Sequence, residues 1–387
     1  DEGATKGVQV VPSASLDALE RRQQEVAQAL GSQLTDAAAE GTLADHPNGA
    51  TEERSDDAAA APDPLTETDY FGTYAKFSIH EEMLSDTVRT ETYREAIMAN
   101  APLFDDKVVL DVGCGTAILS LFAAQAGART VFAVDASAII EQARILVRDN
   151  GFEKQVHCFH ARLEEWQPPP PLVHVDVIIS EWMGYALLYE NMLPALLSAR
   201  RFLAPGGIIL PSSATIRIAA SSHDRLAFWR DVYGFNFSHV AGRLANDASV
   251  ELVPPGTLLS APVPFNTLDM ATVQDEDLDF NAEFELRATC AGSLRSLVVD
   301  FEVDFGPYRG GGAEVVRFGT SCDEPPTHWK QTVLYLRRPR ELSEGDAVVG
   351  SISFARSERY RRGYEIALRL RDAKCGANVE TQLFRLH

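Results

Sequence analysis

Residues 107–119 read KVVLDVGCGTAIL, an apolar run that passes through two glycines into a second apolar run. The first run predicts a buried strand, and the second predicts a helix that continues over residues 120–126. A strand, a glycine turn and a helix in this order let the backbone approach a bound ligand closely. This stretch therefore predicts an α/β sheet with a ligand site at the turn.

The chain continues to alternate strands and helices after this stretch. Residues 131–135 form a second apolar run that ends in Asp135, where an acid can bind both hydroxyls of a ribose. This pattern fits NAD as well as S-adenosylmethionine. The alternation predicts a doubly wound, Rossmann-like sheet that ends near residue 211. We expect helices at residues 137–150 and 192–202, strands at 155–160 and 175–179, and a turn into a last strand at 205–211.

Residues 180–190 read SEWMGYALLYE and place two carboxylates, Glu181 and Glu190, in one loop. The preceding apolar run predicts a central parallel strand, so Glu181 leaves the sheet at its carboxyl edge, where open α/β folds bind ligands. The aromatic and methionine neighbours would exclude water, and two acids in a dry pocket require a cation between them. A guanidinium suits such a pair because its planar fork of donors meets two carboxylates at once. The structural alternative makes Glu181 a cap of the next helix and Glu190 part of its solvated face.

The pattern changes after residue 211 to short runs in which apolar and polar residues alternate, separated by Gly and Pro. This spacing predicts an antiparallel β-barrel or sandwich over residues 212–387. Within it, residues 224–237 predict a helix that is more apolar than a free surface helix. We expect the strands at residues 214–218, 280–289, 297–303, 332–336, 348–354 and 364–370.

Composition limits the class of protein and its partners. The chain has 387 residues, 45% hydrophobic content and a net charge of −21, which predicts a globular protein of two domains. The acidity argues against direct binding to nucleic acid, which depends on Lys and Arg, and favours basic peptides as partners. The five cysteines are scattered singly, which argues against a zinc site and favours a reducing compartment. No apolar run approaches the roughly 20 residues of a membrane span, so we expect no membrane partner.

Residues 1–64 are acidic and poor in aromatic side chains, so we expect a largely disordered tail. Residues 15–30 carry apolar side chains at helical spacing and predict either a docking helix or a transient solvated helix. The folded domains are then expected at residues 65–211 and 212–387.

Four motifs together resemble the protein arginine methyltransferase family. The SEWMGY segment with its second glutamate resembles the family's double-glutamate hairpin. The other motifs are YFGTY at residues 70–74, the acidic-Met-Leu segment at residues 79–89, and Thr-His-Trp at residues 327–329. The resemblance implies S-adenosylmethionine as cofactor and lid helices that close over it. It also implies an inserted helical arm, at about residues 223–260, that carries the contact between two copies.

The resemblance also implies roles for individual residues. The residues expected to hold the cofactor are His80, Met83, Arg89, Asp111, Gly113, Gly115, Asp135, Leu163, Glu164 and Met192. Those expected to contact the protein substrate are Tyr70, Tyr74, Met183, Tyr185 and Trp329. The expected catalytic residues are Glu181, Glu190, His328 and Asp86. By this match His328 meets Asp86, a pair that orients a helix or carries a proton away. Without the resemblance, residues 79–89 predict an ordinary amphipathic surface helix and His328 a structural histidine.

Two positions depart from the family pattern. Ala117 stands where the family has Gly, and Asp135 stands where it more often has Glu. The arm before residue 232 is also shortened. Ala117 and the shortened arm leave open a catalytically silent subunit that stabilises an active partner, and the glycine turn leaves open a dinucleotide-dependent oxidoreductase.

The principal prediction is methyl transfer to arginines of proteins, with Arg-Gly segments, RNA-binding proteins or histone tails as substrates. We expect a homodimer in the cytoplasm or nucleus. Met83, Met192 and the Thr-His-Trp segment resemble the type I subclass, which makes asymmetric dimethylarginine.

Overall fold

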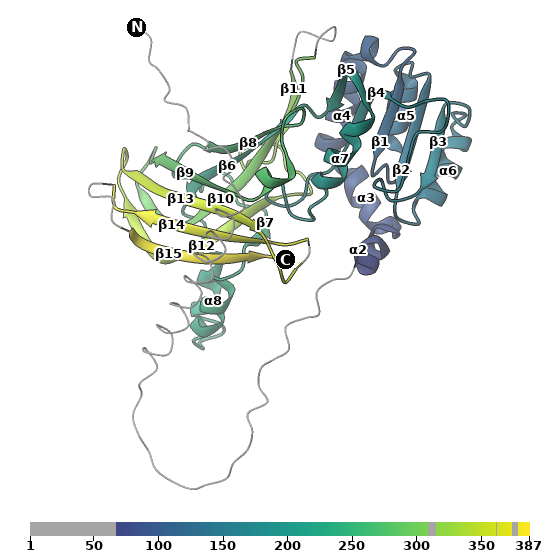
Figure 1. Ribbon diagram of the computed structural model, residues 1–387. Helices are drawn as coiled ribbons and strands as arrows, with labels where there is room; N and C mark the ends of the chain where they lie inside the picture. The colour runs from purple at the N-terminus through teal and green to yellow at the C-terminus, as the bar shows by residue number, and fades with distance from the viewer. Residues whose placement is uncertain (1–66, 309–314, 361, 374–377) are drawn as a thin grey trace, which may run out of the picture. The chain divides into compact units, whose positions relative to one another are not determined.

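The computed structural model describes residues 67–308, 315–360, 362–373 and 378–387. The acidic tail and the helix expected at residues 15–30 lie outside these ranges. A parallel sheet with helices is followed along the chain by antiparallel strands (Figure 1). This confirms the predicted fold class. None of the helices in the described ranges is long and apolar enough to cross a membrane.

Five parallel strands form the first sheet, in the order β3-β2-β1-β4-β5. Strand β1 is buried along its whole length, as its apolar sequence predicts. After β3 the chain crosses back to place β4 beside β1, so the loops after β1 and β4 leave the same edge of the sheet as neighbours. The Ser180 hydroxyl ties these two strand ends together by donating to the Val112 carbonyl at 2.8 Å. The strands are β1 (Val108–Val112), β2 (Thr130–Asp135), β3 (Val156–His160), β4 (Val175–Ser180) and β5 (Leu203–Leu210).

The helices between these strands bury one apolar face each against the sheet. In α6, Ile140, Ala143 and Val147 recur at helical spacing and are buried. The helix expected at residues 192–202 is confirmed as an α-helix that tightens into a 3₁₀ turn at its end. These elements are α5 (Ile118–Gln125), α6 (Ile140–Asp149), α7 (Leu193–Ala199) and η2 (Arg200–Phe202).

Three lid helices precede the sheet, and the single helix expected over residues 79–89 is wrong. The helix is interrupted at Asp86, whose backbone is extended with ψ of 92°. The Asp86 carboxylate accepts the Arg89 amide at 3.0 Å and so caps the following helix. The break turns Arg89 inward, where it is 6% exposed. The lid helices are α2 (Glu67–Tyr74), α3 (Phe77–Ser85) and α4 (Thr87–Ala99), and the short η1 (Ala101–Leu103) follows them.

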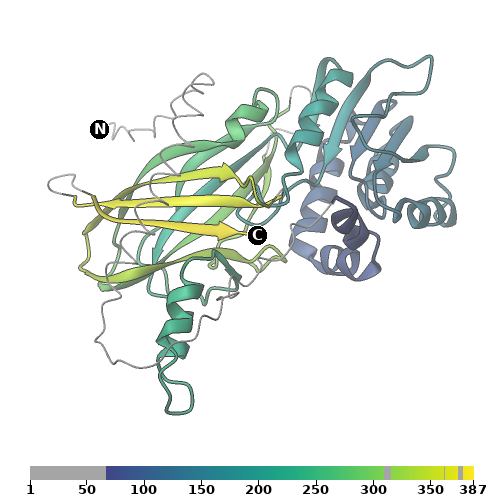
Figure 2. The same cartoon turned by 60° about the horizontal axis from the view of Figure 1, so that its bottom comes forward.

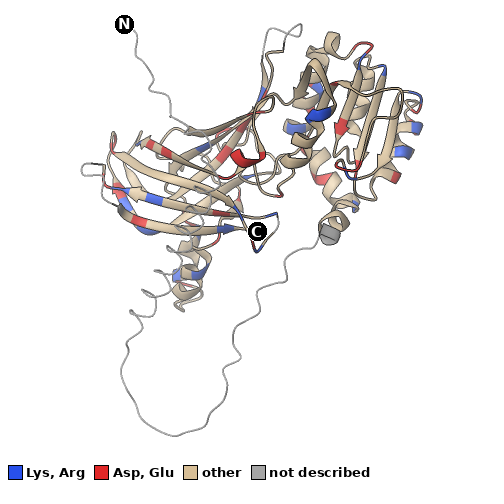
Figure 3. Cartoon of the chain, in the orientation of Figure 1, with Lys and Arg blue, Asp and Glu red and all other residues tan. Residues whose placement is uncertain are grey.

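The antiparallel strands divide into two sheets that share an apolar interior (Figures 1 and 2). One runs β7-β12-β10-β6-β8, with β11 also paired to β10, and the other runs β15-β14-β13-β9. Burial alternates along β9 and β14, as the period-two pattern predicts. Acidic and basic residues are interspersed along these strands (Figure 3). Arg217 of β6, for example, faces Asp300 of β10 and donates to it at 2.6 Å.

Every strand expected after residue 211 lies inside an observed strand, except the one expected at residues 280–289. The strands are β6 (Ser213–Ser221), β7 (Ser249–Glu251), β8 (Val263–Asp269), β9 (Phe280–Arg287), β10 (Gly292–Phe305), β11 (Val316–Gly319), β12 (Gln331–Leu342), β13 (Ala347–Arg356), β14 (Tyr364–Arg371) and β15 (Asn378–Leu386). Two residues of the expected strand at 280–289 extend beyond β9. A short η4 (Asp275–Leu278) precedes that strand.

The arm between β6 and β8 differs from the single helix expected over residues 224–237. It begins with the 3₁₀ helix η3 (Arg225–Arg230) and then turns at Gly234, whose φ is 87°. The Asp231 carboxylate accepts the Gly234 amide at 2.7 Å and stabilises this turn. Helix α8 (Ser238–Leu244) begins only beyond the turn. The prediction fails because apolar content was taken for helical periodicity across a turn that an Asp and a Gly favour.

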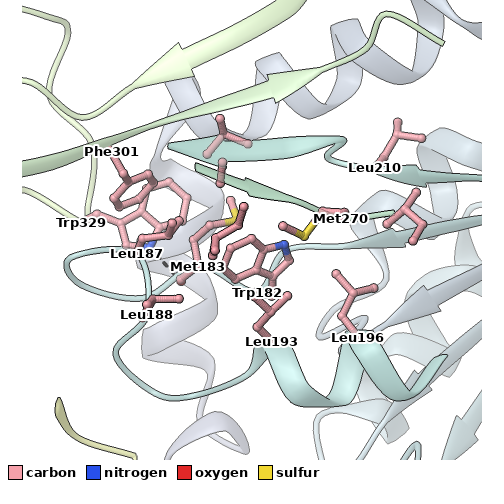
Figure 4. Packing of buried hydrophobic residues seen from close by; sticks show 14 of the residues in the cluster. Trp182, Met183, Leu187, Leu188, Leu193, Leu196, Leu210, Met270, Phe301 and Trp329 are labelled. Atoms are coloured by element: carbon pink, nitrogen blue, oxygen red, sulfur yellow. Dashed lines mark hydrogen bonds between the residues drawn. The ribbon is translucent and has the colours of Figure 1, made fainter. Parts of the chain in front are cut away.

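One apolar core surrounds the double-glutamate loop, residues 181–190 (Figure 4). Its side chains Trp182, Met183, Leu187 and Leu188 pack with apolar residues of α7, with Phe301 of β10 and with Trp329 in the turn before β12. The loop is therefore held from both parts of the fold.

Candidate active site

A cavity of about 310 Å³ opens where β1 and β4 end. It is lined by the lid helices, by the glycine loop after β1 (residues 113–117), by the double-glutamate loop after β4 and by the segment around His328. The predicted site residues that line it are Tyr70, Tyr74, His80, Met83, Arg89, Gly113, Gly115, Asp135, Leu163, Glu164, Glu181, Met183, Tyr185, Glu190, Met192, His328 and Trp329. The other two, Asp86 and Asp111, are buried behind this lining.

The glycine loop approaches the cavity in a conformation that favours glycine. Gly113 and Gly115 have φ of 71° and 54°, and a Cβ on Gly115 would lie 3.1 Å from the His80 ring. Ala117 also adopts the left-handed region, with φ of 66°, at the start of α5. The alanine that replaces the family's glycine therefore adopts a strained backbone conformation at this position.

Asp135 holds the glycine loop in place at the end of β2. Its carboxylate accepts the Gly115 amide at 2.8 Å, and both the amide and the hydroxyl of Ser137 at 2.7 Å. An ionised carboxylate has about four lone-pair sites. The protein occupies three of them, so a carboxylate lone pair remains for a ligand hydroxyl.

Asp111 lies beneath the glycine loop with no exposed surface. The Ser120 hydroxyl donates to its Oδ2 at 2.6 Å, while its Oδ1 has no hydrogen-bond partner in the described residues. Burial raises the pKa of Asp111 to about 7. A buried acceptor without a partner fits a cationic ligand group, and the ammonium of S-adenosylmethionine is such a group. The loop and this carboxylate therefore fit the expected cofactor.

The remaining residues expected at the cofactor line the same cavity from several elements. His80 is buried and donates from Nε2 to the Tyr74 carbonyl at 2.8 Å. The Met192 methyl would lie 3.7 Å from a Cβ on Gly113. Leu163 is buried, whereas Glu164 is exposed beside it at the rim of the cavity.

The double-glutamate loop is strained and tightly packed. Three non-glycine residues of the loop have positive φ, namely Ala186, Leu187 and Glu190, and so does the neighbouring Asn191. Gly184 is required at its position because a Cβ there would lie 1.9 Å from the Tyr189 carbonyl oxygen. Such conformations persist only where surrounding structure fixes them, and they concentrate at functional sites.

Glu181 forms an ion pair with Arg89 at the wall of the cavity. The Arg89 guanidinium donates from Nε at 3.0 Å and from Nη2 at 2.8 Å to the same carboxylate oxygen, Oε2. The other oxygen accepts the Met183 amide at 3.1 Å. Both side chains of the pair are less than a tenth exposed. The helix break at Asp86 thus places the Arg89 guanidinium against Glu181.

Glu190 is held by two tyrosines of α2. The hydroxyls of Tyr70 and Tyr74 donate to its Oε2 at 2.9 and 2.6 Å. Burial raises the pKa of Glu190 above its usual range, and the two tyrosine hydrogen bonds lower it in part. The negative charge of the nearby Glu181 adds to the rise in the pKa of Glu190.

His328 and Asp86 form the expected pair. The Asp86 carboxylate accepts the His328 amide at 2.9 Å and its Nδ1 at 2.7 Å, in addition to the Arg89 amide. Burial alone would raise the pKa of Asp86, but these hydrogen bonds outweigh it and lower the pKa. The pair therefore joins the antiparallel strands to the start of α4.

Trp329 and Met183 support the loop, and Tyr185 faces the cavity. Trp329 is 2% exposed, donates from its indole to the Met183 carbonyl at 3.0 Å and stacks on Phe318. Because Trp329 is almost fully buried, little of its surface is left for the substrate contact that the sequence predicts. Tyr185 is half-buried and stacks on Tyr189.

Three residues that the sequence did not single out also belong to the site. Ser120 binds Asp111, and Tyr93 donates to the Ser180 carbonyl at 2.9 Å. Arg362 donates to the Glu190 carbonyl at 2.7 Å. Ser120 lies on the inward face of a predicted helix, and this position could have identified it from the sequence. Arg362 lies 172 positions from Glu190 and has no local pattern.

The arrangement can hold a flat cation between two carboxylates beside a loop that accepts a nucleoside cofactor. The glutamates interact electrostatically, are largely shielded from water and line the same cavity as the glycine loop. The described ranges contain no cluster of three or more His, Cys, Asp or Glu side chains placed to hold a metal ion.

Comparison with protein families gives two matches. Residues 109–207 match the model of a methyltransferase domain, and residues 212–373 match the arginine methyltransferase oligomerization subdomain.

Known proteins agree with these matches. The chain is 40% identical over 324 residues to protein arginine N-methyltransferase 1 of Chlamydomonas reinhardtii, covering 82% of this chain and 92% of that protein. It is 39% identical over 320 residues to the Saccharomyces cerevisiae protein of the same name, covering 81% of this chain and 91% of that one.

Solved structures agree as well. The Trypanosoma brucei PRMT1 enzyme-prozyme heterotetrameric complex with AdoHcy is similar with a TM-score of 0.75 and 38% identity, over 81% of this chain and all of that one. Arabidopsis thaliana protein arginine methyltransferase 10 is similar with a TM-score of 0.72 and 28% identity, over 82% of this chain and all of that one. The chain therefore belongs to the protein arginine N-methyltransferase family.

Proposed function

We propose that this chain uses Glu181 and Glu190 to present a protein arginine to S-adenosylmethionine, as an S-adenosylmethionine-dependent protein arginine N-methyltransferase. The observation that carries this proposal is the shared cavity, which both glutamates line together with the glycine loop at the ends of β1 and β4. Relatives that share about 40% of their sequence with the chain carry the name of the same enzyme.

The two alternatives explain less. A silent subunit would not require the ion pair at Glu181, the tyrosine pair at Glu190 and the His328 contact to be retained together. The comparisons do not support that alternative. A dinucleotide-dependent oxidoreductase has no use for paired acids in an aromatic pocket, and the family models name a methyltransferase domain.

The bound cofactor supplies a methyl group already activated on a sulfonium. The chain's own residues bind it and exclude water. Asp111 would hold its ammonium, Asp135 a ribose hydroxyl and Glu164 its adenine, while Arg89 would meet its carboxylate. Because Arg89 already binds Glu181, one guanidinium would link the cofactor site to the first glutamate.

The glutamates orient and polarise the substrate. A guanidinium stays protonated at neutral pH and offers its nitrogens only as donors. Two carboxylates draw its positive charge toward the nitrogens that they bind, which leaves the third nitrogen more nucleophilic. Alignment of that nitrogen supplies much of the remaining rate.

Two groups are placed to accept the proton that the substrate nitrogen releases. Glu181 is within the cavity and accepts directly. His328 lines the same cavity and is held by Asp86, whose lowered pKa keeps it ionised. The conservative variant His328→Gln distinguishes these routes, because it removes the second proton acceptor and leaves the first.

The product class proposed here is monomethyl and asymmetric dimethylarginine. Met83 and Met192 both line the cavity, as the type I resemblance predicts. Mass spectrometry of an Arg-Gly-rich peptide after incubation with the purified chain and S-adenosylmethionine tests both function and product. Asymmetric dimethylarginine supports the proposal. Symmetric dimethylarginine would overturn the product class, and an unmodified peptide would overturn the function.

The oligomer proposed here is a homodimer that forms through the arm. Residues 212–373 belong to an oligomerization subdomain. Three aromatic side chains of the arm, Phe228, Tyr233 and Phe235, are 59%, 96% and 69% exposed in the single chain, more than expected unless a partner covers them. Light scattering should give twice the chain mass for the wild type and less for Tyr233→Ser with Phe235→Ser. Its cytoplasmic or nuclear location is likewise a proposal, which cell fractionation tests.

A further inference from the structure

Arg362 reaches the double-glutamate loop from the connection between β13 and β14. Its Nη1 donates to the Glu190 carbonyl at 2.7 Å, and its own carbonyl accepts the Glu190 amide at 2.9 Å. One residue of the antiparallel domain thus satisfies both backbone polar groups of the second glutamate.

The same guanidinium also contacts the lid. Its central carbon lies 3.5 Å from the centroid of the Tyr70 ring, close enough for a strong cation–π contact. The Tyr70 hydroxyl in turn donates to Glu190 Oε2 at 2.9 Å. Arg362, Tyr70 and Glu190 therefore form a closed set of contacts in which each member touches the other two.

Glu190 needs such support because of its backbone. Its φ is 74° and that of Asn191 is 50°, in a region that L-residues with side chains adopt only when neighbours fix them. A free loop would leave this conformation and carry the carboxylate away from the cavity.

We propose that Arg362 is a positioning residue for methyl transfer, which aims the Glu190 carboxylate at the substrate guanidinium and holds α2 against it. The proposal rests on the function proposed above. The alternative is that Arg362 only contributes packing to the end of the antiparallel domain.

Charge gives a way to distinguish the two. The titratable groups around Glu190 come from α2, from the double-glutamate loop and from the β13–β14 connection, and they are Tyr70, Tyr74, Glu181, Tyr185, Tyr189 and Arg362. Of these, Arg362 is the cation, and its charge lowers the pKa of Glu190. Removing that charge should raise the pKa of Glu190 and move the acid limb of the pH–rate profile to higher pH. Loss of packing alone would not move it.

The experiment compares Arg362→Met and Arg362→Lys with Arg359→Met as a matched control. Arg359 is exposed in the same connection and stacks on Tyr360 rather than on the lid. The readouts are kcat and KM for an Arg-Gly-rich peptide across pH, and calorimetric affinities for S-adenosylhomocysteine and for the peptide in its presence.

Arg362→Met should lower kcat/KM for the peptide by about 10- to 100-fold, the range for a hydrogen bond from a charged group. It should also weaken peptide binding and move the acid limb to higher pH, while affinity for S-adenosylhomocysteine changes less than about twofold. Arg362→Lys should keep the acid limb near that of the wild type and restore part of kcat/KM, because it keeps the charge but loses the planar fork. Arg359→Met should match the wild type.

The proposal is overturned if Arg362→Met keeps the wild-type pH profile and peptide affinity. It is also overturned if the Met and Lys variants lose peptide and S-adenosylhomocysteine affinity equally, since that marks a packing role. Absence of methylation by the wild-type chain would instead count against the proposed function. The peptide affinities of the variants would still test Arg362 in that case.

Discussion

Asp111 should make the affinity for the cofactor depend on pH. Because burial raises its pKa to about 7, the carboxylate is protonated below this pH and ionised above it. Only the ionised form attracts a ligand ammonium. Affinity for S-adenosylhomocysteine should therefore rise as pH increases, by about tenfold from pH 6 to pH 8.

Calorimetry over this pH range with the wild type and Asp111→Asn checks the prediction. The Asn variant should bind more weakly and lose the pH dependence. A wild-type affinity that does not change between pH 6 and pH 8 would show that Asp111 titrates outside this range or does not face the ammonium.

Ala117 illustrates two opposing effects at one residue. Its left-handed backbone costs roughly 1–2 kcal/mol relative to glycine, whereas its buried methyl contributes about 0.8 kcal/mol and alanine restricts the unfolded chain by a further 0.4–1 kcal/mol or so. These contributions nearly cancel. Ala117→Gly should therefore change the free energy of unfolding by less than about 1 kcal/mol, as measured by urea denaturation. A larger gain would mean that the alanine strains the whole loop.

Helix α2 works as an element because Tyr70 and Tyr74 lie one turn apart and point at the same carboxylate oxygen. Each hydroxyl bonded to the buried carboxylate contributes about 1.5–3 kcal/mol. Tyr74→Phe should therefore lower kcat/KM for the peptide by about 10- to 100-fold.

The same element sets a pH dependence. The carboxylate of Glu190 must be ionised to hold a guanidinium, and its pKa lies above the usual range. Activity should therefore fall as pH is lowered through that pKa, and Tyr70→Phe with Tyr74→Phe should move this fall to higher pH. Tyr308→Phe is the control, since its hydroxyl donates to the Ile209 carbonyl outside the cavity. Identical pH profiles in all variants would exclude Glu190 as the titrating group.

The helix break at Asp86 is an element that sequence periodicity conceals. Apolar spacing over residues 79–89 continues through the break, because half-buried apolar side chains lie on either side of it, Ile79 and Met83 in α3 and Val88 in α4. Only the cap formed by Asp86, with its distant partner His328, reveals two helices. The local sequence pattern correctly predicted that residues 79–89 are helical, but it predicted one helix where there are two.

Across the whole molecule, predictability followed sequence distance. The parallel sheet, the glycine loop and the double-glutamate loop were predictable because each is coded by one contiguous run. The contact of His328 with Asp86 spans 242 positions and was reached only through the family resemblance. Arg362 was missed because its partner is 172 positions away and no local periodicity marks it. The turn in the arm was missed because apolar content suggested a helix.

The parallel-sheet and antiparallel parts of the chain together enclose one cavity around the double-glutamate loop. Our central claim is that the two glutamates of this loop together hold and polarise the substrate arginine. Glu181→Gln and Glu190→Gln remove charge with almost no change in volume. The control is Glu91→Gln, at an exposed site on α4.

The most direct measurement is single-turnover methyl transfer to an Arg-Gly-rich peptide by these variants with saturating S-adenosylmethionine. We predict that each active-site variant lowers the rate by about 10²–10³-fold, keeps S-adenosylhomocysteine affinity within about threefold of the wild type, and that Glu91→Gln has the wild-type rate. A rate near that of the wild type in either Glu181→Gln or Glu190→Gln would contradict the claim.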